Sequence, residues 1–159
     1  MTGNNTTGSG KKLADFSAEM TSEKTFTLSG YRGTSFVLYF YPKDNTPGCT
    51  TESIAFRDLY QEFKTAGIDI FGLSRDSIRS HENFKAKLDL PFELISDPDE
   101  TVCALFDVIK MKNMYVKQVR GIERSTFLID GNGKIVKEWR AVKVNGHVND
   151  VLEFVNASN

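Results

Sequence analysis

One of the two cysteines in this chain, Cys49, stands where a protein would place a nucleophile. It directly follows Pro47-Gly48, a pair of residues typical of a tight turn. Two threonines and Glu52 come next, and residues of these types favour the first turn of a helix. Unpaired N–H groups and the positive end of the helix dipole stabilise a thiolate at such a position. The sequence therefore predicts a reactive thiolate, in preference to a cysteine that only packs in the core.

The segment before Cys49 predicts a buried strand that leads to this position. Residues 36–41 form an apolar, aromatic run, Pro42 ends it, and a polar loop continues to Pro47. A second apolar run at residues 68–74 predicts a strand parallel to the first, with a helix between the two. Strand, helix and strand of these lengths form a right-handed βαβ unit. We therefore expect Cys49 at the N-terminus of the helix that follows the central strand.

The rest of the chain is patterned as one α/β domain. Strands are predicted at residues 13–18, 25–28 and 90–95 and as a hairpin over 126–140, with a turn or helical turn at 28–33. Further helices are predicted from residue 76 or 77 to about 88, from about 99 to 108, and over 148–155. Residues 110–120 are polar without a clear period and are predicted to be an irregular loop. We expect a single domain at residues 13–159, a mixed sheet with helices on both faces, after a disordered polar tail at residues 1–12.

Composition and charge exclude several classes of function. The formal net charge is -1 without a basic block, which argues against a nucleic-acid partner. No apolar run approaches the roughly 18 residues that suggest a membrane span. The N-terminus lacks the apolar core of a secretory signal, and the two cysteines form neither a zinc pattern nor a disulfide framework. We therefore expect a cytoplasmic protein whose thiols stay reduced.

A resemblance to a known family rests on the residues around Cys49. The order of elements, with a cysteine after the first central strand, resembles the thioredoxin fold. The motif Pro42-x-x-x-Thr46-x-x-Cys49 matches the peroxiredoxin signature. The wider run 39–50 is similar to the bacterioferritin comigratory protein, or peroxiredoxin Q, branch. Further matches span nearly the whole chain after residue 12; they lie at residues 31–33, 96–97, 121–130 and 143–147.

The resemblance implies a thiol peroxidase that reduces hydrogen peroxide and organic hydroperoxides without metal, haem or flavin. It aligns Cys49 with the peroxidatic cysteine, which becomes a sulfenic acid. It aligns Thr46 with the hydroxyl that positions peroxide, Pro42 with the residue that shields the site, and Arg124 with the arginine that completes the pocket. The backbone N–H groups of Gly48 and Cys49 are expected to face the substrate.

Two departures from the family pattern concern the second half of the reaction and a nearby loop. Many members of the branch carry a resolving cysteine five residues after the peroxidatic one, where this chain has Ile54. An external thiol such as glutathione, glutaredoxin or thioredoxin is then expected to resolve the sulfenic acid, in a 1-Cys mechanism. The alternative is an atypical 2-Cys mechanism with Cys103 as the resolving residue. Val116 stands where members usually carry glycine, so the loop before Gly121 is expected to follow another path.

Other interpretations remain open at this point. A disulfide reductase normally needs Cys-x-x-Cys, and Glu52 occupies the second cysteine position. A redox sensor or holdase would use Cys49 only as a switch. His81 is predicted to be a capping or surface residue and His147 to start the last helix, and neither is expected to be a catalytic base or a metal ligand. Members of this branch are often monomers, so a monomer is expected.

Overall fold

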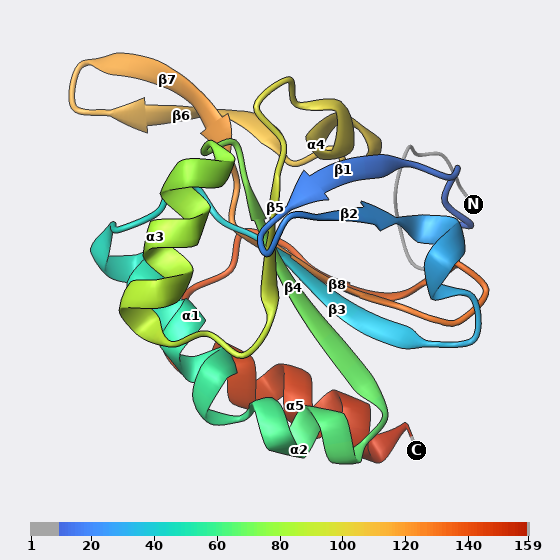
Figure 1. Cartoon of the computed structure of the whole chain (residues 1–159). Coiled ribbons are helices and arrows are strands. Elements are labelled where there is room, and N and C mark those ends of the chain that lie inside the picture. The colour runs from blue at the N-terminus through green and yellow to red at the C-terminus, as the bar shows by residue number, and fades with distance from the viewer. Residues whose placement is uncertain (1–9, 159) are drawn as a thin grey trace.

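The computed structural model describes residues 10–158, except for the side chain of Met114. Its main feature is a seven-stranded sheet with the order β2-β1-β5-β4-β3-β8-β9 (Figure 1). The strands of this sheet are β1 (Ser17–Met20), β2 (Lys24–Thr27), β3 (Ser35–Phe40), β4 (Ile68–Ser74), β5 (Glu93–Ser96), β8 (Ser125–Ile129) and β9 (Ile135–Trp139). The helices are α1 (Pro47–Asp58), α2 (Tyr60–Thr65), α3 (Ile78–Leu88), α4 (Thr101–Phe106) and α5 (His147–Ala157), with a 3-10 turn η1 (Leu28–Tyr31).

The predicted central strand is confirmed at the middle of the sheet. Strand β3 pairs in parallel with β4 and antiparallel with β8, and β4 pairs in parallel with β5. The sheet is therefore mixed, with a βαβ half and a ββα half. The 126–140 hairpin is confirmed as β8 and β9, while the first strand begins later than predicted, at Ser17. The helix after Cys49 is interrupted at Leu59, which separates α1 from α2.

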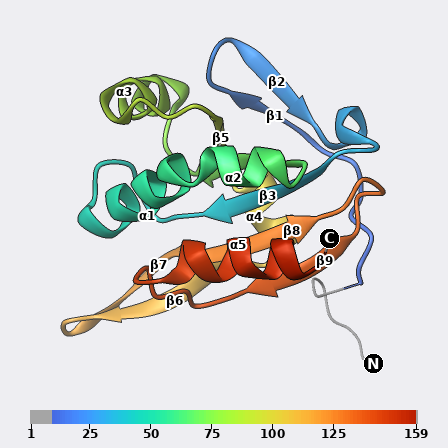
Figure 2. The same ribbon diagram turned by 90° about the horizontal axis from the view of Figure 1, so that it is seen from below.

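Side chains of β3 alternate between two cores, one on each face of the sheet. Val37 and Tyr39, together with Tyr41 directly after the strand, pack with residues of α1, α2, α3 and α5. Leu38 and Phe40 pack with residues of α4, β1 and β2 on the other face. Figure 2 shows α1 and α2 lying along one side of the strands. This arrangement confirms the predicted α/β fold with helices on both faces, and it assigns each cysteine to one face.

The prediction of an irregular loop at residues 110–120 is wrong. Residues Ile109–Met114 form β6 and Lys117–Ile122 form β7, which pair as an antiparallel hairpin outside the main sheet. Tyr115 and Val116 make the connection, and the positive φ of 59° falls on Tyr115. Val116 therefore avoids the left-handed conformation that β-branched residues disfavour. The hairpin escaped prediction because neither of its faces is buried along its length, so it lacks an alternating apolar pattern.

The N-terminal tail predicted at residues 1–12 falls largely outside the described residues. Within the described part, the Gly10 N–H donates to the carbonyl of Ile135, and the Ile135 N–H donates to the carbonyl of Lys11. The chain therefore pairs with β9 slightly before the predicted start of the domain. In residues 10–158, no helix is long and apolar enough to cross a membrane.

Candidate active site

Cys49 is the third residue of α1, as the sequence predicts. Thr46 precedes the helix with extended backbone angles, and Pro47 is the first helical residue, where its missing N–H is harmless. The first N–H groups of a helix have no acceptor within the helix, so those of Gly48 and Cys49 are available to a ligand. The Cys49 side chain is only 1% exposed. The sulfur is therefore almost completely shielded from solvent.

Arg124 reaches Cys49 from the neighbouring strand. Arg124 directly precedes β8. Ser125, the first residue of β8, pairs with Phe40, the last residue of β3, so Arg124 lies close to the start of the loop that leads to Cys49. Its Nη2 donates to the Cys49 Sγ over 3.4 Å. The side chain is 15% exposed, so its permanent charge acts in a partly desolvated setting. This places a fixed cation and donor beside the sulfur, as the resemblance implied.

Glu52 holds the other arm of the guanidinium. Arg124 Nη1 donates to Glu52 Oε1 over 2.7 Å, and the Glu52 side chain is completely buried. Burial raises the pKa of Glu52 to about 7, although the charge of Arg124 and its hydrogen bond act to lower it. The second oxygen, Oε2, has no hydrogen-bond partner among the described residues. The sequence analysis missed this role, although Glu52 lies one helical turn from Cys49 and thus beside it.

Gly48 gives Arg124 room to approach the start of the helix closely. A Cβ atom at this position would lie 3.1 Å from Arg124 Nη2, closer than ordinary packing allows. The same Cβ would lie 3.9 Å from a methyl of Val144. A side chain at position 48 would therefore force the guanidinium beside the sulfur to shift. The glycine serves the site as well as the turn.

Thr46 and Pro42 lie in the loop between β3 and α1. The Thr46 hydroxyl donates to the carbonyl of Lys43 over 2.8 Å, which leaves its oxygen lone pairs as acceptors. Among the described residues, this hydroxyl is bonded to the loop and not to Cys49. Pro42 is half-buried directly after the central strand. The loop thus holds both residues on the chain segment that leads into the Cys49 helix.

A buried network below this loop fixes its path. Asp44 accepts hydrogen bonds from the Tyr41 hydroxyl over 2.6 Å and from Ser80 over 2.8 Å. His81 Nδ1 lies 2.8 Å from Asp44 Oδ2, and His81 Nε2 donates to the carbonyl of Ile95 over 2.9 Å. The prediction that His81 is a capping or surface residue is wrong, because its side chain is fully buried. A clear signal was available, since His81, Phe84 and Leu88 share one helical face.

The same network includes a group of potential metal ligands. Atoms of Asp44, Asp76 and His81 lie within 4.8 Å of one another. Asp76 Oδ2 accepts from the Asp44 N–H over 2.9 Å and from the Ser74 hydroxyl. Because the hydrogen-bonding groups in this cluster satisfy one another, we interpret it as a structural anchor for the loop.

His147 begins α5, as predicted, and is largely buried. Its Nε2 lies 2.8 Å from the hydroxyl of Thr126 on β8. Burial lowers the pKa of His147 to about 4, so the ring is neutral at physiological pH. The histidine ties the last helix to the sheet.

Cys103 lies on the opposite side of the sheet from Cys49. It belongs to the core that contains Phe40 and residues of α4, whereas Cys49 belongs to the core that contains Tyr39 and residues of α1. Both thiols are free and buried. Burial, followed by the nearby Asp97 carboxylate, holds the pKa of the Cys103 thiol far above its usual value. The structure therefore separates the two cysteines and leaves Cys103 protonated.

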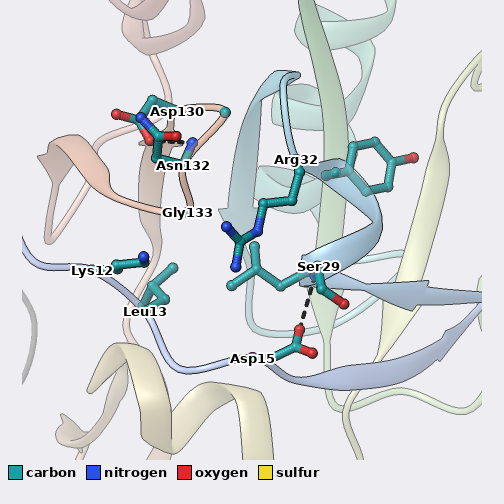
Figure 3. A pocket seen from close by; sticks show the side chains of 11 residues that line it. Lys12, Leu13, Asp15, Ser29, Arg32, Asp130, Asn132 and Gly133 are labelled. Carbon is teal, nitrogen blue, oxygen red and sulfur yellow. Dashed lines mark hydrogen bonds between the residues drawn. The ribbon is translucent and has the colours of Figure 1, made fainter.

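A small cavity lies at the other end of the sheet (Figure 3). Its volume is about 30 Å³, with room for little more than water. Loop residues before β3 and the turn between β8 and β9 line it, among them Arg32, Asp130 and Gly133. The N–H of Ser29 donates to Asp15 at its edge over 2.9 Å. None of these lining residues belongs to the Cys49 site, so the cavity is separate from it.

Comparison with known proteins assigns the family. A model of the AhpC/TSA family matches residues 9–138. Peroxiredoxin Bcp of Xanthomonas campestris is 56% identical over 131 residues, which cover 82% of each chain. Peroxiredoxin Bcp of Bacillus subtilis is 47% identical over 144 residues, 91% of this chain and 92% of the relative. The chain belongs to the AhpC/TSA family of peroxiredoxins, and within it to the branch called peroxiredoxin Bcp or peroxiredoxin Q.

Solved structures support the same assignment. A cysteine-to-serine variant of Xylella fastidiosa PrxQ superposes with a TM-score of 0.93 at 44% identity, over 98% of this chain and 99% of that one. The Xanthomonas campestris bacterioferritin comigratory protein, studied for its alkyl peroxide reduction activity, superposes with a TM-score of 0.86 at 51% identity. That match covers 90% of this chain and 91% of that one. The fold implied by the sequence resemblance is therefore confirmed.

Proposed function

We propose that this peroxiredoxin reduces hydrogen peroxide and organic hydroperoxides through the thiolate of Cys49. The observation that carries the proposal is the position of Arg124, whose guanidinium donates to the Cys49 sulfur over 3.4 Å and to buried Glu52 over 2.7 Å. A permanent cation with fixed donors stabilises a thiolate and the negative charge that grows on a departing oxygen. The alkyl peroxide reduction activity of the Xanthomonas campestris relative supports the same substrate class.

In the proposed reaction, the thiolate attacks the terminal oxygen of the hydroperoxide in line with the O–O bond. An S–O bond forms and the O–O bond breaks, which leaves a sulfenic acid on Cys49. The departing alkoxide, or hydroxide, takes up one proton and leaves as alcohol or water. Arg124 and the N–H groups at the start of α1 stabilise the two peroxide oxygens, while the Thr46 oxygen accepts a hydrogen bond from the hydroperoxide O–H, which stays on the oxygen transferred to sulfur. Pro42 offers no donor and limits access of water to the sulfur.

We further propose a 1-Cys mechanism in a monomer, with resolution by an external thiol such as thioredoxin, glutaredoxin or glutathione. The separation of the cysteines by the sheet supports this proposal, because a disulfide requires Cα atoms within about 7 Å. The protonated state of Cys103 supports it as well, since only a thiolate attacks a sulfenic acid efficiently. Resolution by Cys103 would require α4 to leave its core.

The test is peroxide consumption with dithiothreitol as the reductant. We expect turnover in the wild type and in Cys103→Ser, and none in Cys49→Ser. Circular dichroism of both variants controls for folding. Turnover that survives Cys49→Ser would overturn the assignment of the nucleophile. Turnover lost in a folded Cys103→Ser variant would favour the 2-Cys alternative.

A further inference from the structure

The β6–β7 hairpin exposes apolar side chains to an unusual degree. It projects beyond the main sheet in both views (Figures 1 and 2). At its tip, Tyr115 is 100% exposed and Val116 is 99% exposed. Met111 and Val119 are exposed on its strands, and only Val136 joins these four among the exposed large apolar residues of the described chain. We call Met111, Tyr115, Val116 and Val119 the hairpin patch. Such a concentration is typical of an interaction surface.

The hairpin is also strongly cationic. The segment Ile109–Ile122 contains four basic residues and no acidic residue: Lys110, Lys112, Lys117 and Arg120. Arg120 pairs with Glu100, and Lys110 pairs with Asp107. Lys112 and Lys117 form no ion pair with any described residue. The hairpin therefore presents uncompensated positive charge beside its apolar tip, on a chain whose net charge is -1.

The base of the hairpin adjoins the Cys49 site. Strand β7 ends at Ile122, two residues before Arg124. Burial and the charge of Arg124 lower the pKa of Lys112, which also lies within electrostatic reach of the Cys49 sulfur. Arg120 holds the hairpin to the body, because its Nη1 donates to Glu100 Oε2 over 2.6 Å. The patch thus extends from the rim of the site on a fixed support.

We propose that the β6–β7 hairpin is the docking surface for the protein that reduces Cys49, a dithiol redox protein with an apolar, acidic surface around its thiols. The inference rests on the 1-Cys function proposed above, which requires a thiol from outside. The charge of the hairpin attracts an acidic partner, and its apolar tip gives that partner a surface to cover. The position of its base directs the bound thiol toward Cys49.

The reaction at this surface follows thiol–disulfide chemistry. A thiolate of the partner attacks the sulfur of the Cys49 sulfenic acid, an S–S bond forms, and hydroxide leaves and takes up a proton as water. The second thiol of the partner loses its proton and attacks the partner's own sulfur in this mixed disulfide. The Cys49 thiolate departs, and the partner leaves with an internal disulfide. Docking would place the thiol of a bulky partner beside Cys49, which is only 1% exposed.

A second copy of this chain is a poorer occupant of the same surface. Symmetric pairing through two hairpins would bring two sets of unpaired lysines together, including Lys117 of each copy. Like charges in close contact oppose association. An acidic partner meets the same charges with attraction, so the observations favour it over self-association.

The experiment compares two reductants on the full chain: an acidic bacterial thioredoxin, regenerated by its reductase and NADPH, and dithiothreitol. The variants are Tyr115→Asn with Val116→Ser at the tip, and Lys117→Glu on the strand. Asparagine suits the positive φ of 59° at position 115. Val136→Ser is the matched control, because Val136 is 39% exposed on β9 and outside the hairpin.

We expect the hairpin variants to lower kcat/KM for thioredoxin by about 10-fold or more, with turnover by dithiothreitol within about twofold of the wild type. Wild-type turnover with thioredoxin should fall as salt rises, and less steeply in Lys117→Glu. Unchanged thioredoxin kinetics in the variants, or an equal loss with both reductants, would overturn the proposal. The proposal would also be overturned if sedimentation showed the wild type to be a dimer and the tip variant a monomer. Binding of the protein to anionic vesicles that thioredoxin does not displace would overturn it as well. Absence of wild-type turnover with dithiothreitol would instead refute the peroxidase function itself.

Discussion

Replacing Glu52 by glutamine separates the two forces that act on the buried ion pair beside Cys49. Removal from water disfavours the charged carboxylate, whereas Arg124 at 2.7 Å favours it. The glutamine side chain keeps an oxygen that can accept from Arg124 but carries no charge. The variant therefore preserves the contact with the guanidinium and removes the cost of burying the ion.

The structure sets the magnitude and the sign of the effect. Burial raises the pKa of Glu52 from 4.5 to about 7, so the folded protein binds this proton more tightly than the unfolded chain does. The stabilisation of the folded state by protonated Glu52 is therefore complete at low pH. It declines as the pH rises from 4.5 and is lost above about 7. The gap between the two pKa values corresponds to about 3 kcal/mol.

Urea denaturation of the wild type and of Glu52→Gln at pH 4.5 and pH 8.5 measures this effect. The difference in the free energy of unfolding, variant minus wild type, should rise by about 3 kcal/mol from pH 4.5 to pH 8.5. Other titrating groups cancel in the difference because both proteins contain them. Glu62→Gln, at an exposed position of α2, is the control and should show no such trend. A relative loss of stability at pH 8.5 would refute the reasoning, because the ion pair would then outweigh burial.

Three further results are expected. Gly48→Ala should lower kcat/KM for peroxide by about 10-fold, because its Cβ would lie 3.1 Å from Arg124; Gly30→Ala, where the added Cβ meets no atom within 4 Å, is the control and should not. The wild type should lose stability between pH 6.5 and pH 4, because burial lowers the pKa of His147 to about 4 and the folded state resists its protonation. In His147→Gln, urea denaturation should show this loss smaller by about 3 kcal/mol. Iodoacetamide at pH 7.5 should leave buried Cys103 unmodified until the protein unfolds, and mass spectrometry of digests would reveal any early labelling.

The sequence was most informative where local pattern and tertiary environment agree. The aromatic run before Pro42 occupies the centre of the sheet, and its local sequence pattern alone predicts a buried strand. The turn and small residues around Cys49 likewise specify a helix start without reference to the rest of the fold. Arg124 came from the family resemblance, since no local pattern links a residue before β8 to a thiol 75 positions earlier.

What escaped prediction depends on contacts between distant segments. The pairing of β6 with β7 is invisible in the apolar pattern because both faces of that hairpin are largely polar or exposed. Glu52 looks like an ordinary helix-surface residue until the folded chain buries it against Arg124. A buried ion pair of this kind depends on both partners, so its formation cannot be predicted from either residue alone.

The most direct test of the account is the intact mass of fully reduced protein within seconds of adding one equivalent of hydrogen peroxide. We predict a gain of one oxygen atom, located on Cys49 after trapping of the sulfenic acid and digestion. Loss of two hydrogens without dimer formation would contradict the 1-Cys mechanism and show that Cys103 reaches Cys49. An unchanged mass would contradict the claim that Cys49 is a peroxidatic thiolate.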